Sequence, residues 1–176
     1  MRESEFFADC FAPVYDENSK VLLLGSNPPP DSREAEFYYS GPHNRFWQTI
    51  SAVFGEPVPT GNDNAEKIAA KKAFCYKHRI ALWDVFKACD RVGASDSTIK
   101  NEEPNDIKGL LEKTNITHVF CLGQKAYDGY CELRKKLNKA IPEADLLVSS
   151  SCAARRAKSD AELIVHYKEE LMKVLG

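Results

Sequence analysis

Short apolar runs that alternate with amphipathic helical patterns constrain the fold of this chain most strongly. The runs with the length of buried strands are Val21–Ser26, Ile80–Trp83, His118–Leu122 and Asp145–Ser149. Helical patterns are predicted over residues 44–54, 65–78, 106–113, 125–138 and 160–175. Such alternation implies crossover connections, and therefore a parallel sheet covered by helices on both faces. We expect an α/β protein of three α/β/α layers around a central, mostly parallel four-stranded sheet.

The expected sheet also predicts where a ligand binds. In open α/β sheets, ligands lie beyond the carboxyl ends of the strands, so the loops that follow the strands should carry the chemistry. These loops begin at Asn27, Asp84, Gly123 and Ser149. The sequence has no internal repeat, low-complexity tract or linker, and we expect one domain over residues 1–176.

Charge and cysteine usage exclude several classes of protein. A formal net charge of −2 argues against a polycationic binder, although it leaves room for an enzyme that concentrates positive charge on one face. The six cysteines include no CxxC pair and the four histidines have no metal-binding spacing. We therefore expect free thiols, no metal, no iron–sulfur cluster and no other cofactor.

No run of about 18 apolar residues occurs, and the first residues lack the apolar core of a signal peptide. We expect a cytoplasmic monomer with no membrane association.

The segment Gly25–Trp47, GSNPPPDSREAEFYYSGPHNRFW, is the most informative for function. Proline fixes φ and lacks a backbone donor, so three consecutive prolines should hold the chain in an extended path and present Asn27 from a stiff loop. We expect no regular structure between these prolines and Tyr38. Asn44 then opens the next amphipathic helix. The spacing allows two amides and one aromatic ring to share a pocket.

These motifs resemble the uracil-DNA glycosylase superfamily. GSNPPP and YYSGPHNRFW are similar to the Gly-x-Asn-Pro loop and the later Asn-Arg-Phe-Trp of its mismatch-specific uracil-DNA glycosylases. Residues 11–26 and 80–99 more closely resemble the hypoxanthine-DNA glycosylase branch. The similar segments cover about half of the chain in the same order. The resemblance implies a uracil-DNA glycosylase-like fold. It also implies a monofunctional DNA glycosylase of base-excision repair, which flips a deaminated base out of DNA and hydrolyses its N-glycosidic bond.

Two asparagines are the catalytic candidates that the resemblance implies. Asn27 matches the asparagine of the Gly-x-Asn-Pro loop, and Asn44 matches the one assigned to the hypoxanthine branch. An asparagine is a poor proton acceptor, but its carbonyl can orient a water and its NH2 group can bind an acceptor on the base. The alternative for Asn44 is a helix cap before Arg45, and the two roles are compatible because they can use different atoms.

Base and DNA contacts are implied by the same resemblance. Tyr39 stands where relatives place an aromatic ring against the extruded base, and backbone donors near Gly25, Ser26 and Tyr39 can bind base carbonyl oxygens. The loop expected to bind phosphate and to fill the vacated stack contains Ser149, Ser150, Ser151, Cys152, Ala153, Arg155 and Arg156. A polar turn before a solvated helix is the alternative for this loop. It contains no His or Pro, so a histidine that stabilises the anionic base is not implied.

The segment from Asp84 to Ile99 is expected to be a loop. Its polar side chains can line the far wall of the pocket, contact DNA or join the loop together, and we favour a structural hydrogen-bonding role for Asp84. No lysine lies in the motif loops as a Schiff-base nucleophile, so hydrolysis without strand cleavage is expected.

Several functional readings remain open. Deaminated bases are natural substrates because mispaired bases are cheapest to extrude. Asn27 favours uracil or a mismatch, whereas residues 80–99 and the amino-terminal segment favour hypoxanthine, to which we lean. The alternatives are a mismatch-specific uracil/thymine glycosylase, a non-catalytic nucleic-acid-binding module of the same fold, and a hydrolase of free nucleosides.

Overall fold

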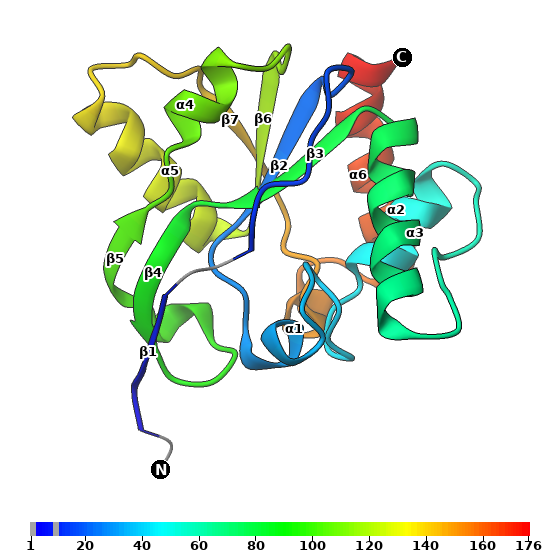
Figure 1. The fold of residues 1–176 in the computed structure, drawn as a ribbon, viewed down its shortest axis with the longest axis horizontal. Coiled ribbons are helices and arrows are strands. Elements are labelled where there is room, and N and C mark those ends of the chain that lie inside the picture. The colour runs from blue at the N-terminus through cyan, green and yellow to red at the C-terminus, as the bar shows by residue number, and fades with distance from the viewer. Residues whose placement is uncertain (1–2, 9–10) are drawn as a thin grey trace.

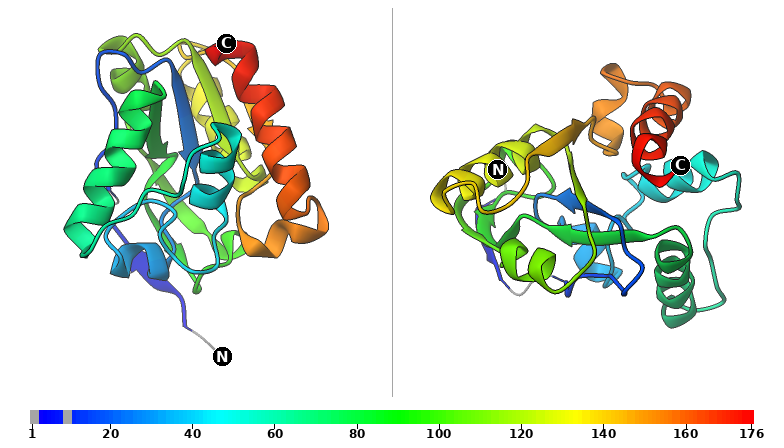
Figure 2. Two further views of the ribbon diagram at one scale, coloured as in Figure 1. Left: turned by 90° about the vertical axis from the view of Figure 1, so that its right-hand side faces the viewer. Right: turned by 90° about the horizontal axis from the view of Figure 1, so that it is seen from above.

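A computed structural model describes residues 3–8 and 11–176. A parallel sheet of order β3-β2-β6-β7 forms its centre (Figure 1). Its strands are β2 (Val21–Gly25), β3 (Ile80–Asp84), β6 (His118–Leu122) and β7 (Ala144–Leu147). Helices cover both faces of this sheet, as the view from above shows (Figure 2). The predicted three-layer α/β/α fold is confirmed.

The period of the central strand explains the two-sided core. Successive side chains of a strand point to opposite faces. Leu23 of β2 therefore belongs to one hydrophobic cluster, while Leu22 and Leu24 belong to the other, and all three are fully buried. An uninterrupted apolar strand is thus the expected pattern for a sheet buried on both faces.

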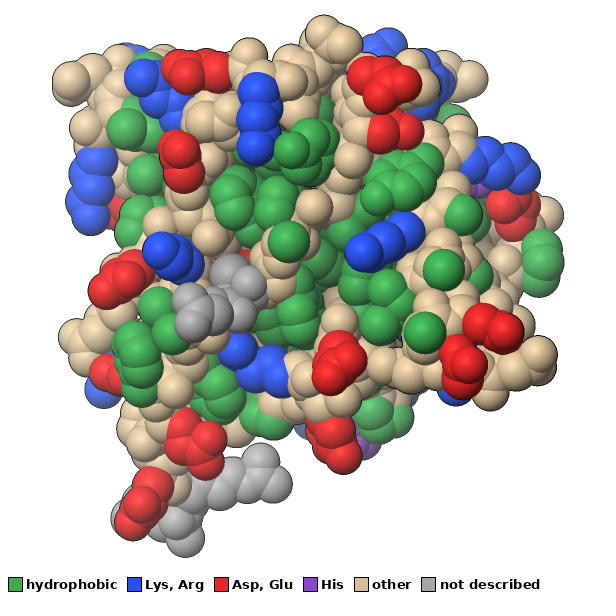
Figure 3. Space-filling model, viewed as in Figure 1, with side chains coloured by type: hydrophobic (Ala, Val, Ile, Leu, Met, Phe, Trp, Pro, Cys, Tyr) green, Lys and Arg blue, Asp and Glu red, His purple; other side chains and the backbone are tan. Residues whose placement is uncertain are grey.

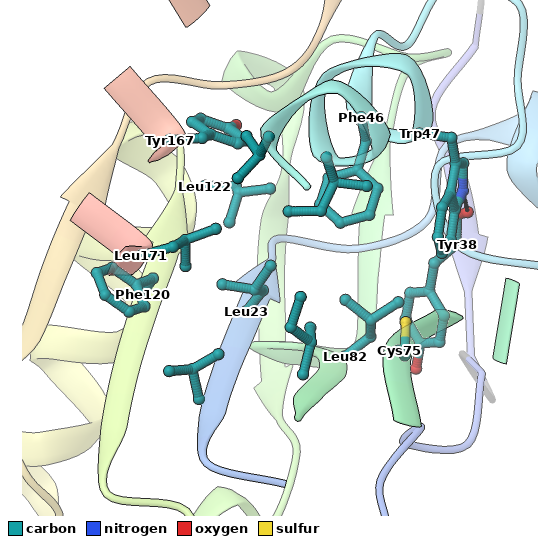
Figure 4. Close-up of a cluster of buried hydrophobic side chains, with 14 of the residues drawn as sticks. Leu23, Tyr38, Phe46, Trp47, Cys75, Leu82, Phe120, Leu122, Tyr167 and Leu171 are labelled. Atoms are coloured by element: carbon teal, nitrogen blue, oxygen red, sulfur yellow. Dashed lines mark hydrogen bonds between the residues drawn. The ribbon is translucent and has the colours of Figure 1, made fainter. Parts of the chain in front are cut away.

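Three helices cover the first face: α2 (Phe46–Val53), α3 (Asn64–Lys77) and α6 (Asp160–Leu175). Figure 4 shows Leu23, Leu82 and Phe120 of the sheet opposite Phe46, Tyr167 and Leu171 of α2 and α6. The second face is covered by α4 (Ile107–Glu112) and α5 (Gln124–Lys136). The start of α6 is marked in the sequence, because Ser159 and Glu162 form a reciprocal capping box there.

A second, antiparallel sheet was missed by the sequence analysis. It has the order β1-β4-β5 and consists of β1 (Glu5–Phe7), β4 (Phe86–Arg91) and β5 (Lys100–Pro104). The expectation of a loop from Asp84 to Ile99 was therefore wrong. Strand β5 has the sequence KNEEP and is exposed at every position, so no apolar periodicity marks it. Its partner β4 is short and carries three charged residues.

A short helix, α1 (Pro30–Glu34), lies where no regular structure was expected, and that prediction was also wrong. Proline is tolerated at the first helical position because the N–H that it lacks has no intrahelical partner there. Pro29 keeps the expected extended conformation, with φ −71° and ψ 167°. The proline run thus ends one loop and begins a helix.

On the face seen in Figure 3, hydrophobic side chains gather near the middle and charged side chains of both signs lie mainly toward the edges. No helix within the described residues is long and apolar enough to cross a membrane. The described cysteines, Cys75, Cys89, Cys121, Cys131 and Cys152, are free thiols. Cys10 lies outside the described residues.

Candidate active site

A cavity of about 600 Å³ opens beyond the carboxyl ends of the parallel strands. These ends lead into the loops of the lower half of Figure 1, near α1. The chain passes from β2 to its neighbour β3 on one side and from β6 to its neighbour β7 on the other side. The place between the carboxyl ends of β2 and β6 is therefore a topological switch point. The cavity is lined by residues of all four predicted loops, including Asn27, Asp84, Gly123 and Ser149. It also brings Asn27, Tyr39 and Asn44 together.

Asn27 is 3% exposed, and its side chain is held by three partners. Its Nδ2 donates to the Phe86 carbonyl at 3.1 Å, while its Oδ1 accepts from Arg33 at 2.9 Å and from Arg91 at 3.5 Å. Arg91 also donates to the Asn27 backbone oxygen at 2.7 Å. Because guanidinium groups only donate hydrogen bonds, the amide atom that faces Arg33 and Arg91 is the oxygen. Because that oxygen already accepts two hydrogen bonds, it has no lone pair left to orient a water.

Asn44 precedes α2 and combines the two roles considered for it. Its Oδ1 accepts from the Phe46 backbone N–H at 2.9 Å, which is the capping interaction, and from the Ser150 hydroxyl at 2.8 Å. The helix begins at Phe46, one residue later than expected. No hydrogen bond of the Asn44 Nδ2 is found among the described residues, so this amide nitrogen is the group available to the contents of the cavity.

Tyr39 has a positive φ of 52°, and its ring packs against Phe46 with a centroid distance of 4.3 Å and an interplanar angle of 31°. The ring is therefore braced by the first residue of α2 while it lines the cavity. Its hydroxyl is buried without a hydrogen-bond partner in the described part of the chain. Burial, with a smaller contribution from Asp84, raises the pKa of this hydroxyl well above its usual value. Tyr38 also lines the cavity, but its hydroxyl donates to the Phe11 and Ala12 carbonyls.

The predicted base-binding residues Gly25 and Ser26 also line the cavity. Their carbonyl oxygens accept from Val85 and Phe86, which ties the Gly25–Asn27 turn to the start of β4. The Ser26 hydroxyl donates to Asp96 at 2.8 Å. The turn is thus supported by strand β4, which lies in the segment that the sequence analysis expected to be a loop.

The predicted DNA-binding loop lies on the other side of the cavity. Ser149, Ser150, Ser151 and Ala153 line it, and Cys152 begins a 3-10 helix, η2 (Cys152–Arg156). An isolated antiparallel bridge joins Asn44 to Ser151, flanked by backbone hydrogen bonds from Arg45 to Ser150 and from Cys152 to His43. Arg155 and Arg156 are exposed at the end of η2. The Asn44 segment and this loop are therefore one structural unit.

Arg45, which the sequence analysis used only as a helix start, fastens this unit. It is 1% exposed, and its guanidinium donates to the Lys158 carbonyl at 2.9 Å and to Asp160 at 3.1 Å. Asp160 also accepts from Arg155 at 3.1 Å. Arginine is rarely buried, so an arginine directly before an apolar helix was the feature of the sequence that could have indicated a buried, paired guanidinium group.

Asp84 lies at the end of β3, lines the cavity and is 3% exposed. Its Oδ2 has no hydrogen-bond partner among the described residues, so the expected structural role for this side chain was wrong. Burial, followed by the Asp96 carboxylate, raises its pKa to about 7, although Arg33 and Arg91 act in the opposite direction. Its position at a strand end was the available signal.

Lys125 was missed as a cavity residue, whereas Arg91 belongs to the segment whose polar side chains were considered for the far wall of the pocket, and it lines the cavity. Arg91 is fully buried, and it joins Asn27 to Asp96, to which its guanidinium donates at 3.4 Å. Lys125 lies at the start of α5 and is paired with Glu102 at 2.5 Å. No group of three or more His, Cys, Asp or Glu within the described residues is arranged to hold a metal ion.

Comparison with known proteins agrees with this geometry. Residues 12–174 match the Uracil DNA glycosylase superfamily. A Methanosarcina acetivorans protein named hypoxanthine DNA glycosylase is 38% identical over 154 residues, which cover 86% of this chain and 91% of the relative. A Methanosarcina barkeri protein of the same name is 36% identical over 148 residues, covering 84% and 88%.

A solved structure has the same fold. The NMR structure of a Methanosarcina acetivorans protein with a provisional uracil DNA glycosylase name superposes with a TM-score of 0.72 at 33% identity. The match covers 96% of this chain and 99% of that one. The chain described here therefore belongs to the uracil DNA glycosylase superfamily.

Proposed function

We propose that this protein excises hypoxanthine from DNA by monofunctional hydrolysis in base-excision repair, with uracil as a second candidate base. The observation that carries the proposal is that Asn27, Tyr39 and Asn44 line one shared cavity at the switch point of the sheet. The chain is a DNA glycosylase, a hydrolase of N-glycosyl bonds, by its superfamily and by relatives at 36–38% identity. The two relatives' names favour hypoxanthine as its base.

In the proposed reaction, the base leaves the helix and its ring lies against Tyr39. The C1′–N9 bond breaks with its electron pair going to the base, through an oxocarbenium-like state. A water oxygen then bonds to C1′, and one water proton is finally taken up by the departing base. Asparagine cannot take that proton, and both ends of the Asn27 amide are already engaged, so only Asn44 can orient a reacting group directly. Asn44 Nδ2 is the free donor, and Asn27 holds the turn that faces it.

The DNA backbone would run along Ser149–Ser151 and η2. Small hydroxyl side chains let the backbone approach a phosphate closely, and Arg155 and Arg156 add positive charge at the exposed end. In this arrangement Cys152 and Ala153 would form a small wedge that fills the space left by the flipped base. We retain as proposals that residues 1–176 form one domain and that the protein is a cytoplasmic monomer.

Excision from defined duplexes tests the proposal. Labelled duplexes that each hold one hypoxanthine, uracil, xanthine or G·T mismatch are incubated with the protein, and alkali then reveals abasic sites. We expect hypoxanthine to be released fastest and no strand cleavage before alkali. Preferential release from the uracil or thymine mismatch would support the mismatch-specific alternative. Tight binding without release of any base would support the non-catalytic module.

Salt dependence separates a DNA enzyme from a hydrolase of free nucleosides. Contacts to phosphates release counterions, so the logarithm of DNA affinity should fall linearly with the logarithm of salt concentration. Removal of one phosphate contact, by Arg156→Ala, should reduce the slope by about 1. Activity on free deoxyinosine that is insensitive to salt would contradict the proposal.

A further inference from the structure

Val148 links strand β7 to the predicted DNA-binding loop, and helix α6 holds both of its backbone polar groups. Its N–H donates to His166 Nε2 at 3.2 Å, and its carbonyl accepts from the Tyr167 hydroxyl at 2.7 Å. Strand β7 is the last strand in the order β3-β2-β6-β7. Two side chains of α6 thus satisfy the backbone at the point where the chain leaves this edge strand and enters Ser149–Ser151.

The contact with Val148 fixes the chemical state of His166. A backbone N–H only donates, so Nε2 must carry a lone pair, and the neutral ring then holds its proton on Nδ1. Protonation of Nε2 would turn it into a donor that faces another donor. The Tyr167 hydroxyl donates to the carbonyl, and burial raises its pKa, so it keeps its proton at ordinary pH. Only the contact with His166 therefore depends on pH.

The surroundings of His166 favour the neutral ring at pH 7. Burial lowers its pKa from the ordinary value of 6.5. The nearby charges have smaller effects: the pKa is lowered by Lys158 and Lys173 and raised by Glu170 and Glu169. Among the other elements near α6, α2 contains no charged residue, and β7 contributes Asp145, whose charge acts on Lys173. The neutral ring is thus the form that holds Val148 at pH 7.

The loop that Val148 enters is joined directly to the site. The Ser149 carbonyl accepts from Arg45 at 3.5 Å, and the Ser150 hydroxyl donates to Asn44 Oδ1 at 2.8 Å. Ser149, Ser150 and Asn44 line the cavity. A change in the position of Val148 should therefore alter both the proposed phosphate contact and the hydrogen bond that orients the Asn44 amide.

We propose that His166 is a positioning residue that, in its neutral form, holds the Ser149–Ser151 loop in the conformation that binds DNA. This inference rests on the proposed function, because that loop is the proposed phosphate contact. His166 does not line the cavity, so it acts through Val148 and touches neither the base nor the sugar. Protonation of His166 as the pH falls should weaken DNA binding.

The pH dependence of DNA binding tests this role. Kd is measured between about pH 5 and pH 8, the range in which histidine titrates, for a duplex that carries uncleavable 2′-fluoroarabinosyl hypoxanthine. The wild type is compared with His166→Gln, because a glutamine oxygen can accept from the Val148 N–H and does not titrate. We expect the two proteins to bind equally at pH 8. At the acid end, the wild type should bind about fivefold to tenfold more weakly, on the scale of one lost hydrogen bond.

A charge effect alone would have the opposite sign. Protonated His166 adds positive charge, which by itself would make the wild type bind DNA more tightly than His166→Gln at acid pH. Titration of the other groups is common to both proteins and cancels in the ratio of their Kd values. His118→Gln is the matched control, because His118 is exposed at the amino end of β6 and does not line the cavity. It should leave the pH profile unchanged.

His166→Phe keeps an aromatic ring and removes the acceptor. It should bind the duplex about fivefold to tenfold more weakly than the wild type at pH 8, and His166→Gln should restore the affinity. The Tm of each variant is measured alongside. If His166→Phe does not fold, the comparison of the wild type with His166→Gln still decides the question.

The tautomer can be read without any activity. Long-range ¹H–¹⁵N NMR spectra at pH 7 should show the His166 proton on Nδ1 and a bare Nε2. The opposite tautomer would overturn the inference whether or not the protein excises hypoxanthine.

A ratio of the wild-type and His166→Gln Kd values that stays constant with pH, or tighter wild-type binding at acid pH, would also overturn the inference. So would equal affinity of His166→Phe and the wild type at pH 8. In a protein that excises hypoxanthine, these results leave the proposed function intact. If the wild-type protein excises no deaminated base, the proposed function fails and the inference falls with it.

Discussion

At the residue scale, the site combines amide oxygens that are engaged in hydrogen bonds with a tyrosine hydroxyl and a carboxyl oxygen that are not. Asn27 and Asn44 both use their oxygens internally, whereas the Asn44 nitrogen, the Tyr39 hydroxyl and the Asp84 carboxyl lack described partners. Groups that are fixed in orientation before the substrate arrives need no reorganisation during the reaction. The free groups are therefore the ones placed to touch the base or the water.

Asn27→Ala and Asn44→Ala should each lower the single-turnover rate of excision by about 10²–10³, the scale seen when one preorganised polar group is lost. Asn115→Ala is the matched control, because Asn115 is exposed and its side chain donates to the Glu17 carbonyl, outside the residues that line the cavity. Rates are compared at saturating protein. Unaltered excision in both cavity variants would remove the proposed mechanism.

Tyr39→Ala should weaken binding of an uncleavable hypoxanthine duplex by about 10–100-fold, because a stacked base contributes about 1–3 kcal/mol. Tyr39→Phe keeps the ring that packs on Phe46 and should bind within a few-fold of the wild type. The measurement is the Kd of each variant for this duplex. An equal loss in both variants would assign the effect to the hydroxyl and not to the ring.

Asp84 should make stability depend on pH. Its pKa is about 7 in the folded protein against 3.8 as the ordinary value, so folding favours the protonated form. The native state is therefore unpenalised below about pH 4 and loses stability as pH rises toward 7, by up to about 4 kcal/mol. The facing groups are Asp96, which raises the pKa, and Arg33 and Arg91, which lower it.

The free energy of unfolding of Asp84→Asn, measured by urea titration between pH 4 and pH 8, checks this dependence. We expect the variant to gain stability over the wild type progressively through that range. A difference that stays constant across the range would show that the carboxyl does not titrate there.

At the scale of elements, the first turn of α2, the loop after β7 and the start of α6 are joined by Arg45. This side chain reaches the Ser149 and Lys158 carbonyls from the position that directly precedes α2. The catalytic candidate Asn44 and the phosphate-binding candidates are therefore held together by the same contacts. The arrangement places both asparagine loops on elements that are packed against the core, which favours precise positioning.

Arg45→Met should lower the free energy of unfolding by about 2–3 kcal/mol, because several buried hydrogen bonds are lost together. Arg155→Met removes the exposed partner of the same Asp160 and should have little effect on stability. Both are measured by urea titration at neutral pH. Equal effects of the two substitutions would show that Arg45 acts as a surface ion pair.

The sequence predicted the elements that carry strong apolar patterns and missed those that do not. Strands β2, β3 and β6 are continuous apolar runs, and α6 shows its cap in Ser159 and Glu162. Strand β5 was missed because its side chains are all exposed, so its pairing with β4 has no signature in hydrophobic period. Helix α1 was missed because Pro30 was read as a breaker when it occupies the first helical position.

The same contrast holds for the candidate site. The motif residues Asn27, Tyr39 and Asn44 could be chosen from their spacing, and the structure brings them to one cavity. The hydrogen-bond partners of each amide depend on Arg33, Arg91 and Ser150, which lie on different elements. Such pairings are fixed by tertiary packing. Asp84 shows the limit most clearly, since only the absence of a described partner distinguishes it from an ordinary buried acid.

At the scale of the whole molecule, the two sheets have different roles in building the site. The parallel sheet supplies four strand ends around the cavity, and the antiparallel sheet braces the turn from Gly25 to Asn27 through β4. With a net charge of −2, attraction to DNA must come from local groups such as Arg155 and Arg156 at one rim. Catalysis in this chain would depend on loops from all four parallel strands, which the fold brings to one cavity, and not on one motif.

The most direct measurement is the structure of the protein bound to a duplex that carries 2′-fluoroarabinosyl hypoxanthine. We predict that the base lies in the cavity against Tyr39, with its sugar beside Asn44. A hypoxanthine that stays stacked in the helix, or that enters a different part of the protein, would contradict the proposed site.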